Sequence, residues 1–398
     1  MKIYEIGTGY TPIPAQMGAA TEIVVEELTR SLRRNGETAE IIDIKAVQRK
    51  NTALPIIEVC VPRIFTKTDV SLGIMHKLKR VYYSISLAMK LKTILKQSDE
   101  QVVLHFHNQY NLFFFLKLVS RKLQNRAIIG YTVHSYVWGT RWNEIEKTVK
   151  KKYFQEIYCV RNADIVFVLN DITVDHFVNR LSVKRERVHK ILNGVNVERY
   201  APLSGEIILK LKRAGGLTGK KVVFQVGSVC PRKNQLGSIK MLARYMQDHT
   251  DVVFMYAGGI IDAAYQESIK QFAAENGILD QIKYVGELSP GEQLNRYYNI
   301  ADCCIFTSAL ESFGLVVIEA ISSGTPIIVG SNLMFSLESG YSIYHNTEEF
   351  VSLVDQILQS DPAERSASEE ILENYSWDSV ALMYSKIFKE YIKQPLLN

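Results

Sequence analysis

The chain has little cysteine, and none of it has the spacing of a disulfide framework or a metal site. Only five of its 398 residues are cysteines: Cys60, Cys159, Cys230, Cys303 and Cys304. We therefore expect five reduced thiols, which is typical of a cytosolic protein.

Long apolar runs and secretion signals are also missing. No stretch reaches the roughly 18 apolar residues of a membrane-spanning helix, and the most apolar patch, Leu112–Lys117, is short. The first residues, Met1–Ile6, lead directly into an expected strand and contain no apolar signal core. With neither tandem repeats nor low-complexity segments, the sequence predicts a soluble, cytoplasmic, globular protein.

Positive charge is concentrated in the first half. The first 200 residues carry 31 Lys or Arg against 19 Asp or Glu, whereas the remainder carries 16 against 23. This asymmetry indicates that one domain faces anions, such as anionic lipid headgroups or an acidic acceptor. Nucleic acid is not favoured as a partner, because no recognised binding motif accompanies the charge.

Strand and helix patterns alternate along the chain and restart near Lys221. A chain of this length is too long for one ordinary core, so we expect two domains. The alternation predicts an α/β fold with two mostly parallel sheets, each covered on both faces, with ligands at the carboxyl ends of the strands. The strands are expected at Lys2–Gly7, Thr38–Asp43, Val102–Phe106, Ala127–Val133, Ile165–Leu169, Lys221–Gly227, Val252–Ala257, Ile282–Gly286, Asp302–Thr307 and Pro326–Gly330.

Several other segments are assigned from composition. Helices are expected at Ala20–Arg34, Gln235–Gln247 and Trp377–Ile392. The segment Leu192–Val197 and the glycine-containing stretch Gly205–Gly219 predict an interdomain linker.

Two carboxylates, Glu311 and Glu319, flank a nearly apolar run after the strand expected at Asp302–Thr307. A tight turn at Ser312–Gly314 and a helix from Leu315 would gather backbone N–H groups and the positive end of the helix dipole, which suits a phosphate. Glu319 would lie among apolar neighbours, where an ionised carboxylate requires a partner such as a ligand hydroxyl. Taken alone, the pair is also compatible with a solvated helix edge.

A basic loop follows the first strand of the second half. Arg232 and Lys233 lie between that strand and the helix Gln235–Gln247. Both side chains can pair with a diphosphate, each charge-assisted hydrogen bond being worth about 1.5–3 kcal/mol. A solvated basic turn is the alternative that these residues leave open.

The loop after the first strand contains small residues, Gly18 and Ala19, that let the backbone approach a ligand closely. An ordinary strand-to-helix turn explains them equally well. Gly7 and Gly9 lack the third glycine of a dinucleotide fingerprint, so the sequence does not favour NAD binding.

Histidines follow or end two of the expected strands. His134 comes after Ala127–Val133, where a lone histidine is either structural or in contact with a ligand. His105 and His107 point the same way from Val102–Phe106, but the sequence shows no third ligand, so no metal site is predicted.

The segment Ile74–Gln97 combines apolar residues at helical spacing with positive charge. Its apolar positions are Leu78, Val81, Ile85 and Met89, and its positive ones are Lys77, Lys79, Arg80, Lys90, Lys92 and Lys96. A surface helix on an anionic membrane and a core-facing helix with a solvated basic face both fit this pattern.

The string Glu311–Glu319, followed by Ala320 and Gly324–Pro326, closely resembles the donor-site signature of retaining, family 4 type glycosyltransferases of the GT-B fold (glycosyl transferases group 1). The resemblance covers nearly the whole chain, is strongest from Lys221 to Gly330, and fades beyond it.

The sequence departs from the family pattern at two positions. Ser228 stands where the family has an arginine that neutralises the leaving phosphate, and Ser135 replaces the aspartate of a His-Asp pair. Arg232, one residue before the matching Lys233, is a hypothetical substitute for the missing arginine.

The resemblance implies a role for each matching residue. Glu319 would hold the ribose hydroxyls and Glu311 the donor-sugar hydroxyls, while Lys233 would neutralise the departing diphosphate and His134 would contact the donor sugar. The remaining donor-binding residues that it implies are Phe313, Gly314, Leu315, Arg232, Ser228, Gly18 and Ala19.

The implied fold is GT-B, with two Rossmann-like domains and a cleft between them. Residues 1–197 would form the acceptor domain and 198–376 the donor domain, with a helix in 377–398 crossing back to the first. The resemblance implies transfer, with retention, from a nucleotide diphosphate sugar, most simply a UDP-sugar, to a glycan, lipid-linked or small-molecule hydroxyl. It implies no metal or other cofactor. It also implies that the cytoplasmic protein can associate peripherally with the inner face of the membrane.

Two alternatives remain open at this point. One is a GT-B nucleotide-sugar epimerase, which does not explain the Glu311–Glu319 string. The other is a catalytically weak, nucleotide-sugar-binding partner subunit, which Ser228 and Ser135 favour.

Overall fold

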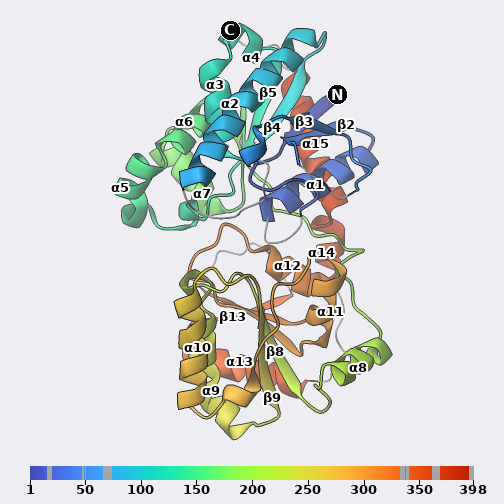
Figure 1. The fold of residues 1–398 in the computed structure, drawn as a ribbon, viewed down its shortest axis with the longest axis vertical. Coiled ribbons are helices and arrows are strands. Elements are labelled where there is room, and N and C mark those ends of the chain that lie inside the picture. The colour runs from blue at the N-terminus through green and yellow to red at the C-terminus, as the bar shows by residue number, and fades with distance from the viewer. Residues whose placement is uncertain are drawn as a thin grey trace. The chain divides into compact units, whose positions relative to one another are not determined.

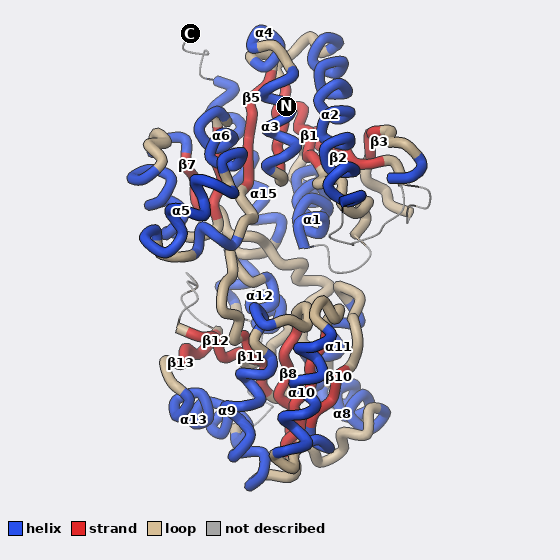
Figure 2. The backbone as a smooth tube through the Cα atoms, turned by 60° about the vertical axis from the view of Figure 1, so that its left-hand side comes forward, coloured by secondary structure: helices blue, strands red, loops and turns tan. Residues whose placement is uncertain are grey.

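The chain divides into two compact α/β units, which are described separately. The computed structural model describes residues 1–15, 20–46, 49, 51–65, 74–331, 337, 340–360 and 368–393. Unit 1 consists of Met1–Gly194 with Trp377–Asn398, and unit 2 consists of Val195–Ser376. Each unit contains one parallel sheet with helices on both sides (Figures 1 and 2), so the predicted fold class is confirmed.

Unit 1 is built on a seven-stranded sheet with the order β3-β2-β1-β4-β5-β6-β7. The central strands are buried on both faces, which explains why most of their residues are apolar rather than alternating with polar ones. Glu5, Asp43 and His105 are buried exceptions. The strands are β1 (Lys2–Ile6), β2 (Thr38–Ile44), β3 (Ile56–Val59), β4 (Val102–Phe106), β5 (Ala127–Thr132), β6 (Ile165–Val168) and β7 (Val188–Lys190). The α-helices are α1 (Ala20–Arg34), α2 (Ile74–Gln97), α3 (Gln109–Leu118), α4 (Arg121–Gln124), α5 (Trp142–Lys152), α6 (Phe154–Asn162), α7 (Asp171–Asp175) and α15 (Trp377–Lys393).

Unit 2 is built on a six-stranded sheet with the order β10-β9-β8-β11-β12-β13. The strands are β8 (Lys221–Val226), β9 (Val252–Ala257), β10 (Ile282–Tyr284), β11 (Cys303–Phe306), β12 (Ile327–Gly330) and β13 (Tyr341–Tyr344). The α-helices are α8 (Gly205–Ala214), α9 (Gln235–Asp248), α10 (Ala263–Glu275), α11 (Glu292–Ile300), α12 (Leu315–Ser322), α13 (Thr347–Gln359) and α14 (Glu369–Asn374). Its first and last residues, Val195 and Ser376, form a β-bridge, so unit 2 begins and ends at one place.

Three short strands and one helix differ from the sequence-based expectation. The strands β3, β7 and β13, each at the edge of a sheet, were not predicted. The stretch Gly205–Gly219 was predicted to be a linker, but Gly205–Ala214 forms α8, which packs on α11. That prediction was wrong because Gly205 is the first residue of the helix, where glycine is tolerated, and the other glycines begin only at Gly215, where the helix ends.

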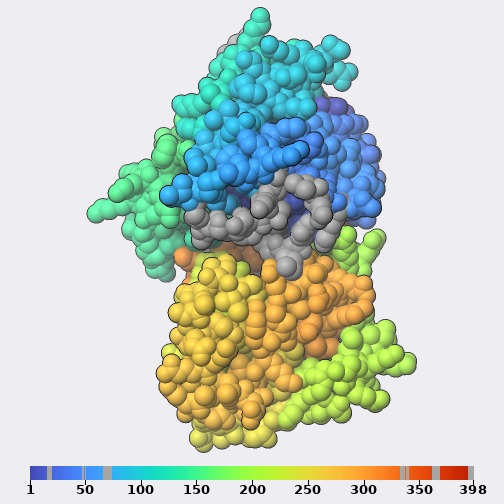
Figure 3. Space-filling model, viewed as in Figure 1, coloured from blue at the N-terminus to red at the C-terminus, as the bar shows by residue number. Residues whose placement is uncertain are grey.

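Helix α2 has two apolar faces. Tyr83, Leu87 and Leu91 are buried in the core of unit 1. The four apolar residues singled out from the sequence are 39–51% exposed, and they are Leu78, Val81, Ile85 and Met89. The core-facing alternative is therefore wrong for these four. The atoms of α2 form part of the surface of unit 1 that faces the viewer in Figure 3.

The positive residues of α2 do not all lie on its solvated face. Lys79 is buried, and its Nζ donates a hydrogen bond to the carbonyl of Tyr10 at 3.0 Å. Within the described residues, no helix is both long enough and apolar enough to cross a membrane.

Candidate functional site

In the parallel sheet of unit 2, the order in which successive strands are added reverses between the neighbouring strands β8 and β11. From β8 the chain proceeds to β9 and β10 on one side, and from β11 to β12 and β13 on the other. In open parallel sheets such a switch point leaves a crevice beyond the strand ends where ligands bind. The loops that follow β8 and β11 carry the basic residues and Glu311, respectively.

Two cations converge on Glu311 at these strand ends. Glu311 Oε1 lies 2.7 Å from Arg232 Nη1 and 2.6 Å from Lys233 Nζ. Arg232 also donates to the carbonyl of Leu310 at 3.1 Å, so the two loops are linked by both side chain and backbone. The predicted residues Arg232, Lys233 and Glu311 therefore form one cluster, and the solvated-turn alternative is wrong for Lys233, only 14% of whose side chain is exposed.

A buried amide holds the two loops in place. Gln225, at the end of β8, donates to the carbonyl of Lys233 at 2.7 Å and to Thr307 Oγ1 at 3.1 Å. Ser238 of α9 also bonds Thr307 Oγ1, at 2.6 Å. Because these polar atoms are buried and paired, removing one would leave another unsatisfied, which makes the network rigid.

Ser228, the position of the family arginine, lies in the turn after β8. Its neighbour Gly227 has φ +148°, and a side chain there would approach Lys233 to 3.2 Å. The carbonyl of Ser228 accepts from Gln235 Nε2 at 3.1 Å. The structure thus explains the glycine beside Ser228, whereas the serine itself contributes no charge to the cluster.

Glu319 lies within α12 and is held by tyrosines. Tyr298 Oη donates to Glu319 Oε2 at 2.8 Å, and Tyr200 also hydrogen-bonds this carboxyl. Burial raises the pKa of Glu319 to about 7, although the two phenol hydrogen bonds oppose this shift. The carboxyl is therefore poised between its charged and neutral forms near neutral pH.

Helix α12 begins at Leu315, directly after Gly314, which adopts φ +91° and has no side chain to cap the helix. Phe313 is buried and fixes the preceding turn. The helix start is thus a place where a ligand oxygen can accept from the backbone.

Unit 1 also has a switch point, between β1 and β4, and a pocket of about 310 Å³ lies there. Its lining residues come from β5 and the segments that follow β1, β4 and β5, together with α1, α2, α5 and α6. Those that matter below are Thr8, Tyr10, Glu22, Arg80, His107, His134, Ser135 and Glu156. His134 therefore lines a pocket, as a ligand-contacting residue would, whereas Gly18 and Ala19 lie outside the described residues.

The carboxylates of this pocket are paired with neutral donors. Glu156 accepts from Tyr131 Oη at 2.7 Å, from Trp138 Nε1 at 2.9 Å and from Ser135 Oγ at 2.9 Å. Thr8 Oγ1 donates to Glu22, whose pKa burial raises to about 7. Ser135, the departure from the family's His-Asp pair, thus uses its hydroxyl to hold Glu156.

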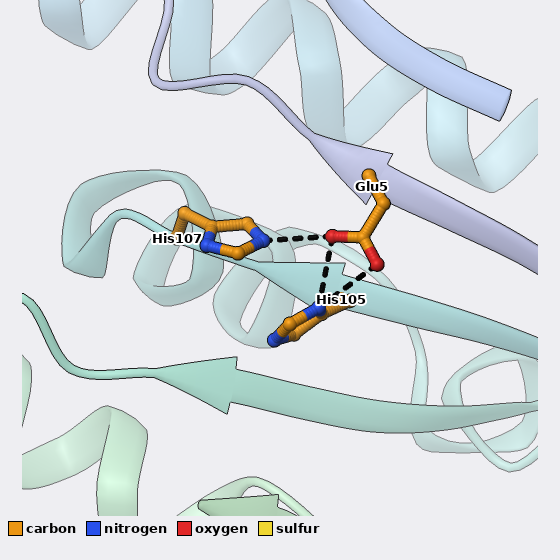
Figure 4. A group of neighbouring side chains, drawn as sticks. All are labelled: Glu5, His105 and His107. Carbon is orange, nitrogen blue, oxygen red and sulfur yellow. Dashed lines mark hydrogen bonds and ion pairs between the residues drawn. The ribbon is translucent and has the colours of Figure 1, made fainter. Parts of the chain in front are cut away.

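Three buried side chains gather beneath the pocket. Glu5 on β1 contacts His105 at the end of β4 and His107 just beyond it (Figure 4). Their donor atoms lie within 4.8 Å of one another, which is compatible with a metal site. The sequence analysis found no third ligand because Glu5 is distant in sequence and adjacent only through the pairing of β1 with β4.

Another hollow, of about 680 Å³, lies elsewhere on unit 1. It is bordered by α5 and α6 and by residues 179–181, and Trp142, Phe154 and Tyr158 supply its aromatic lining. None of the residues predicted to act on a ligand lines it.

The sequence did not point to three residues of these sites. Tyr200 and Tyr298 hold Glu319, and Glu5 holds the two histidines. The only signal available was that a carboxylate in a buried strand or helix requires donors, but it does not say which donors.

Two family models match the chain. The model for Glycosyltransferase Family 4 matches residues 21–199, and the model for Glycosyl transferases group 1 matches residues 209–373. A D-inositol 3-phosphate glycosyltransferase of Mycolicibacterium smegmatis is 28% identical over 246 residues, which make up 58% of this chain and 55% of that protein. The match thus spans little more than half of that relative's length.

Solved structures share the fold. Sucrose-phosphate synthase from Thermosynechococcus elongatus has a TM-score of 0.75 at 20% identity, covering 98% of both chains. Anabaena HepE, solved in complex with UDP-glucose, has a TM-score of 0.70 at 15% identity, covering 98% of this chain and 100% of that one. These structures show that the fold of the chain is GT-B. The two family models show that it consists of a Glycosyltransferase Family 4 segment followed by a Glycosyl transferases group 1 segment.

Proposed function

We propose that the chain is a retaining glycosyltransferase that moves a sugar from a nucleotide diphosphate sugar to a hydroxyl of a glycan, lipid-linked or small-molecule acceptor. The observation that carries this proposal is the convergence of Arg232 and Lys233 on Glu311 at the strand ends of unit 2. The complex of HepE with UDP-glucose favours UDP as the nucleotide.

The ion pairs suggest how the donor binds. A diphosphate arriving at the strand ends would take Arg232 and Lys233 from Glu311, because phosphate offers more charge and more acceptor oxygens than one carboxylate. Glu311 would then be available to accept from hydroxyls of the donor sugar. In the transition state Lys233 would stabilise the charge that grows on the departing diphosphate, with Arg232 replacing the arginine that Ser228 does not supply.

The second carboxylate and the helix start would hold the rest of the donor. Glu319 would accept from the ribose hydroxyls, while the backbone N–H groups of Phe313, Gly314 and Leu315 would bind phosphate or sugar oxygens. His134 would contact the sugar.

The chemistry we propose needs no enzyme nucleophile and no metal. The acceptor hydroxyl attacks the anomeric carbon from the face that the diphosphate leaves, so configuration is retained. A phosphate oxygen takes the acceptor's proton, and the two cations supply the positive charge that a metal would otherwise provide.

Calorimetry with UDP, GDP and ADP, without added metal, tests the donor site in wild type and in Glu319→Ala. We expect one nucleotide to bind and the substitution to weaken its affinity by at least tenfold. Glu292→Ala, which removes an exposed carboxylate of the same unit, is the matched control. Absence of binding by all three nucleotides would contradict the proposal.

A second candidate is a catalytically weak, nucleotide-sugar-binding partner subunit, which Ser228 favours. It predicts nucleotide binding without turnover in wild type, and turnover gained by Ser228→Arg. Ser289→Arg, at an exposed position of the same unit, controls for added charge. Turnover by the unmodified chain alone would eliminate this candidate.

We also propose that α2 binds the inner face of an anionic membrane. Its exposed apolar stripe includes Leu78, Ile85 and Met89, and Lys77, Lys90 and Lys96 are exposed on the same helix. Co-sedimentation with phosphatidylglycerol vesicles should therefore fall in a Leu78→Ser, Ile85→Ser variant, but not when the equally exposed Ile207 and Leu209 of α8 are changed to serine. Equal co-sedimentation of the two variants with the vesicles would contradict this part of the proposal.

A further inference from the structure

Four side chains of unit 1 form one hydrogen-bonded series that leads into the pocket. Glu5 Oε2 lies 2.7 Å from His107 Nε2 and 2.8 Å from His105 Nδ1 (Figure 4). His107 Nδ1 in turn lies 3.0 Å from His134 Nε2. Glu5, His105 and His107 are buried, whereas His134 is partly exposed and lines the pocket.

The charge of Glu5 determines which atom carries the proton in the hydrogen bond between Glu5 and His107. Burial alone would raise the pKa of Glu5, but the charges and hydrogen bonds of His105 and His107 lower it to about 2. Glu5 is therefore a carboxylate at neutral pH and can only accept hydrogen bonds. His107 Nε2 must then carry a proton, because a nitrogen lone pair directed at a carboxylate would be repelled.

The direction of the hydrogen bond between His107 and His134 follows from that of the bond between Glu5 and His107. Burial, together with the charge of His105, lowers the pKa of His107 to about 4, so this imidazole is neutral at pH 7 and has a single N–H group. That group is used by Glu5, and His107 Nδ1 is therefore an acceptor. His134 must donate to it through Nε2, which leaves a lone pair on His134 Nδ1.

We propose that Glu5 and His107 are positioning residues that hold His134 in its Nε2–H tautomer, so that His134 Nδ1 accepts a hydrogen bond from a substrate hydroxyl. The inference rests on the proposed function for the identity of the ligand as a sugar. It adds a specificity rule, because a hydroxyl can donate to Nδ1 whereas a carboxylate or carbonyl at the same place would meet a second lone pair. The pocket thus selects a ligand that places a hydroxyl at this position over one that places a carboxylate there.

Metal binding by Glu5, His105 and His107 would require the opposite placement of protons. A coordinated His107 would direct the Nε2 lone pair at the ion and keep its proton on Nδ1. It would then donate to His134 Nε2, and the proton of His134 would lie on Nδ1. The tautomer of His134 therefore distinguishes the two arrangements.

The test is nitrogen NMR of the full chain labelled with ¹⁵N-histidine, without ligand. The resonances of His134 are identified by their loss in His134→Asn. In wild type we expect Nε2 in the protonated range and Nδ1 in the unprotonated range, a result that requires no destabilising variant. A protonated Nδ1, or a mixture of the two tautomers, would overturn the proposal, as would one equivalent of metal in the purified protein.

The variant Glu5→Gln sharpens the test. Its amide can present either its oxygen or its NH2 group to His107 Nε2, whereas the carboxylate can only accept there. We therefore expect His134 to populate both tautomers in this variant, and a His134 that stays entirely in the Nε2–H form would overturn the role of the Glu5 charge in positioning it. The matched control is His105→Asn, because His105 bonds the same carboxylate but directs its other nitrogen to Thr132, at 2.7 Å.

Binding of UDP-glucose provides the functional readout. A hydroxyl–imidazole hydrogen bond lost from the complex should weaken affinity by roughly three- to tenfold in His134→Phe. Glu5→Gln should weaken it by a smaller factor, because part of its His134 keeps the accepting Nδ1. If neither UDP nor UDP-glucose binds the wild type, the proposed function fails while the tautomer result still decides the positioning role. If UDP-glucose binds and both variants match wild type, His134 does not contact the ligand and the inference fails alone.

Discussion

The strand-end sites of the two units hold their carboxylates in different ways. In unit 1, Glu156 accepts from three uncharged donors, and Glu5 from two buried imidazoles. In unit 2, Glu311 is held by the cations Arg232 and Lys233. A neutral donor gains little by exchanging its carboxylate for a phosphate, whereas a cation that is paired with a carboxylate can form a stronger ion pair with a phosphate.

This difference separates a fixed site from an exchangeable one. A fully satisfied buried network costs much to disturb, because each removed partner leaves a buried group unpaired. In the cation cluster, Arg232 still pairs with Glu311 when Lys233 is removed, so little stability depends on one cation. Truncation of a group in the buried network of unit 1 should therefore act mainly on folding, whereas substitutions in the cation cluster of unit 2 should act on ligand binding and turnover.

The largest effect is expected from Lys233→Ala. Loss of the cation that faces the departing diphosphate should lower kcat by about 10²–10³-fold, as removal of a transition-state donor does elsewhere. The free energy of unfolding should change by less than about 1 kcal/mol, because Arg232 remains paired with Glu311 in this variant. The measurements are steady-state turnover and urea unfolding, with the exposed Lys240→Ala as control. A large loss of stability would erase the distinction between the two sites.

The second effect is a loss of stability in unit 1 from Glu156→Ala. Three buried donors, on Tyr131, Trp138 and Ser135, would lose their acceptor, and we expect the free energy of unfolding to fall by about 3 kcal/mol. Glu146→Ala removes only a surface pair with Lys150 and should cost less than about 1 kcal/mol. Equal unfolding midpoints for the two variants would contradict a fixed network.

The third effect concerns pH and Glu319. Its pKa is raised to about 7, so the carboxyl becomes protonated, and unable to accept from ribose hydroxyls, as pH falls through 7. Affinity for UDP should fall about tenfold between about pH 8 and about pH 6. In Glu319→Gln the part of this pH dependence that comes from Glu319 should disappear, and only the part that comes from titration of the UDP phosphate should remain. Parallel pH profiles of the two proteins would show that Glu319 does not bind the nucleotide.

The smallest effect is expected from Tyr298→Phe. Removing the phenol that donates to Glu319 raises the pKa of this carboxyl further, which should move the midpoint of the affinity profile to higher pH. At pH 7 we expect UDP to bind about two- to fivefold more weakly. Tyr297→Phe, on the same helix but packed on Phe224, should leave the profile unchanged. A midpoint that does not move would assign Tyr298 to packing alone.

Much of the fold follows from local sequence. The strands β4 and β9 were predicted to the residue, because strands buried on both faces are largely apolar runs, interrupted in β4 only by His105. The edge strand β13 was missed because its side chains are only partly buried and its sequence carries no such run. Pairing of edge strands is decided by the neighbouring strand, which a local pattern does not contain.

The candidate site was predictable where its residues are close in sequence. The loop with Arg232 and Lys233 and the string from Glu311 to Glu319 are short motifs, and the ion pairs between them agree with one common site. The partners that set charge and orientation are distant in sequence, as with Tyr200 and Glu319, or Glu5 and His107. Such pairs arise only when parallel strands or packed helices bring them together.

The β-bridge between Val195 and Ser376 has a consequence for synthesis on the ribosome. All of unit 2 leaves the ribosome before α15, although α15 belongs to unit 1 and follows it in the chain. Tyr384 and Phe388 of this last helix pack on the ring of His105, at 5.2 and 5.5 Å between ring centroids. The nascent chain therefore completes unit 2 before unit 1, and the apolar cover over the Glu5 cluster is added only after all of unit 2 has been synthesised.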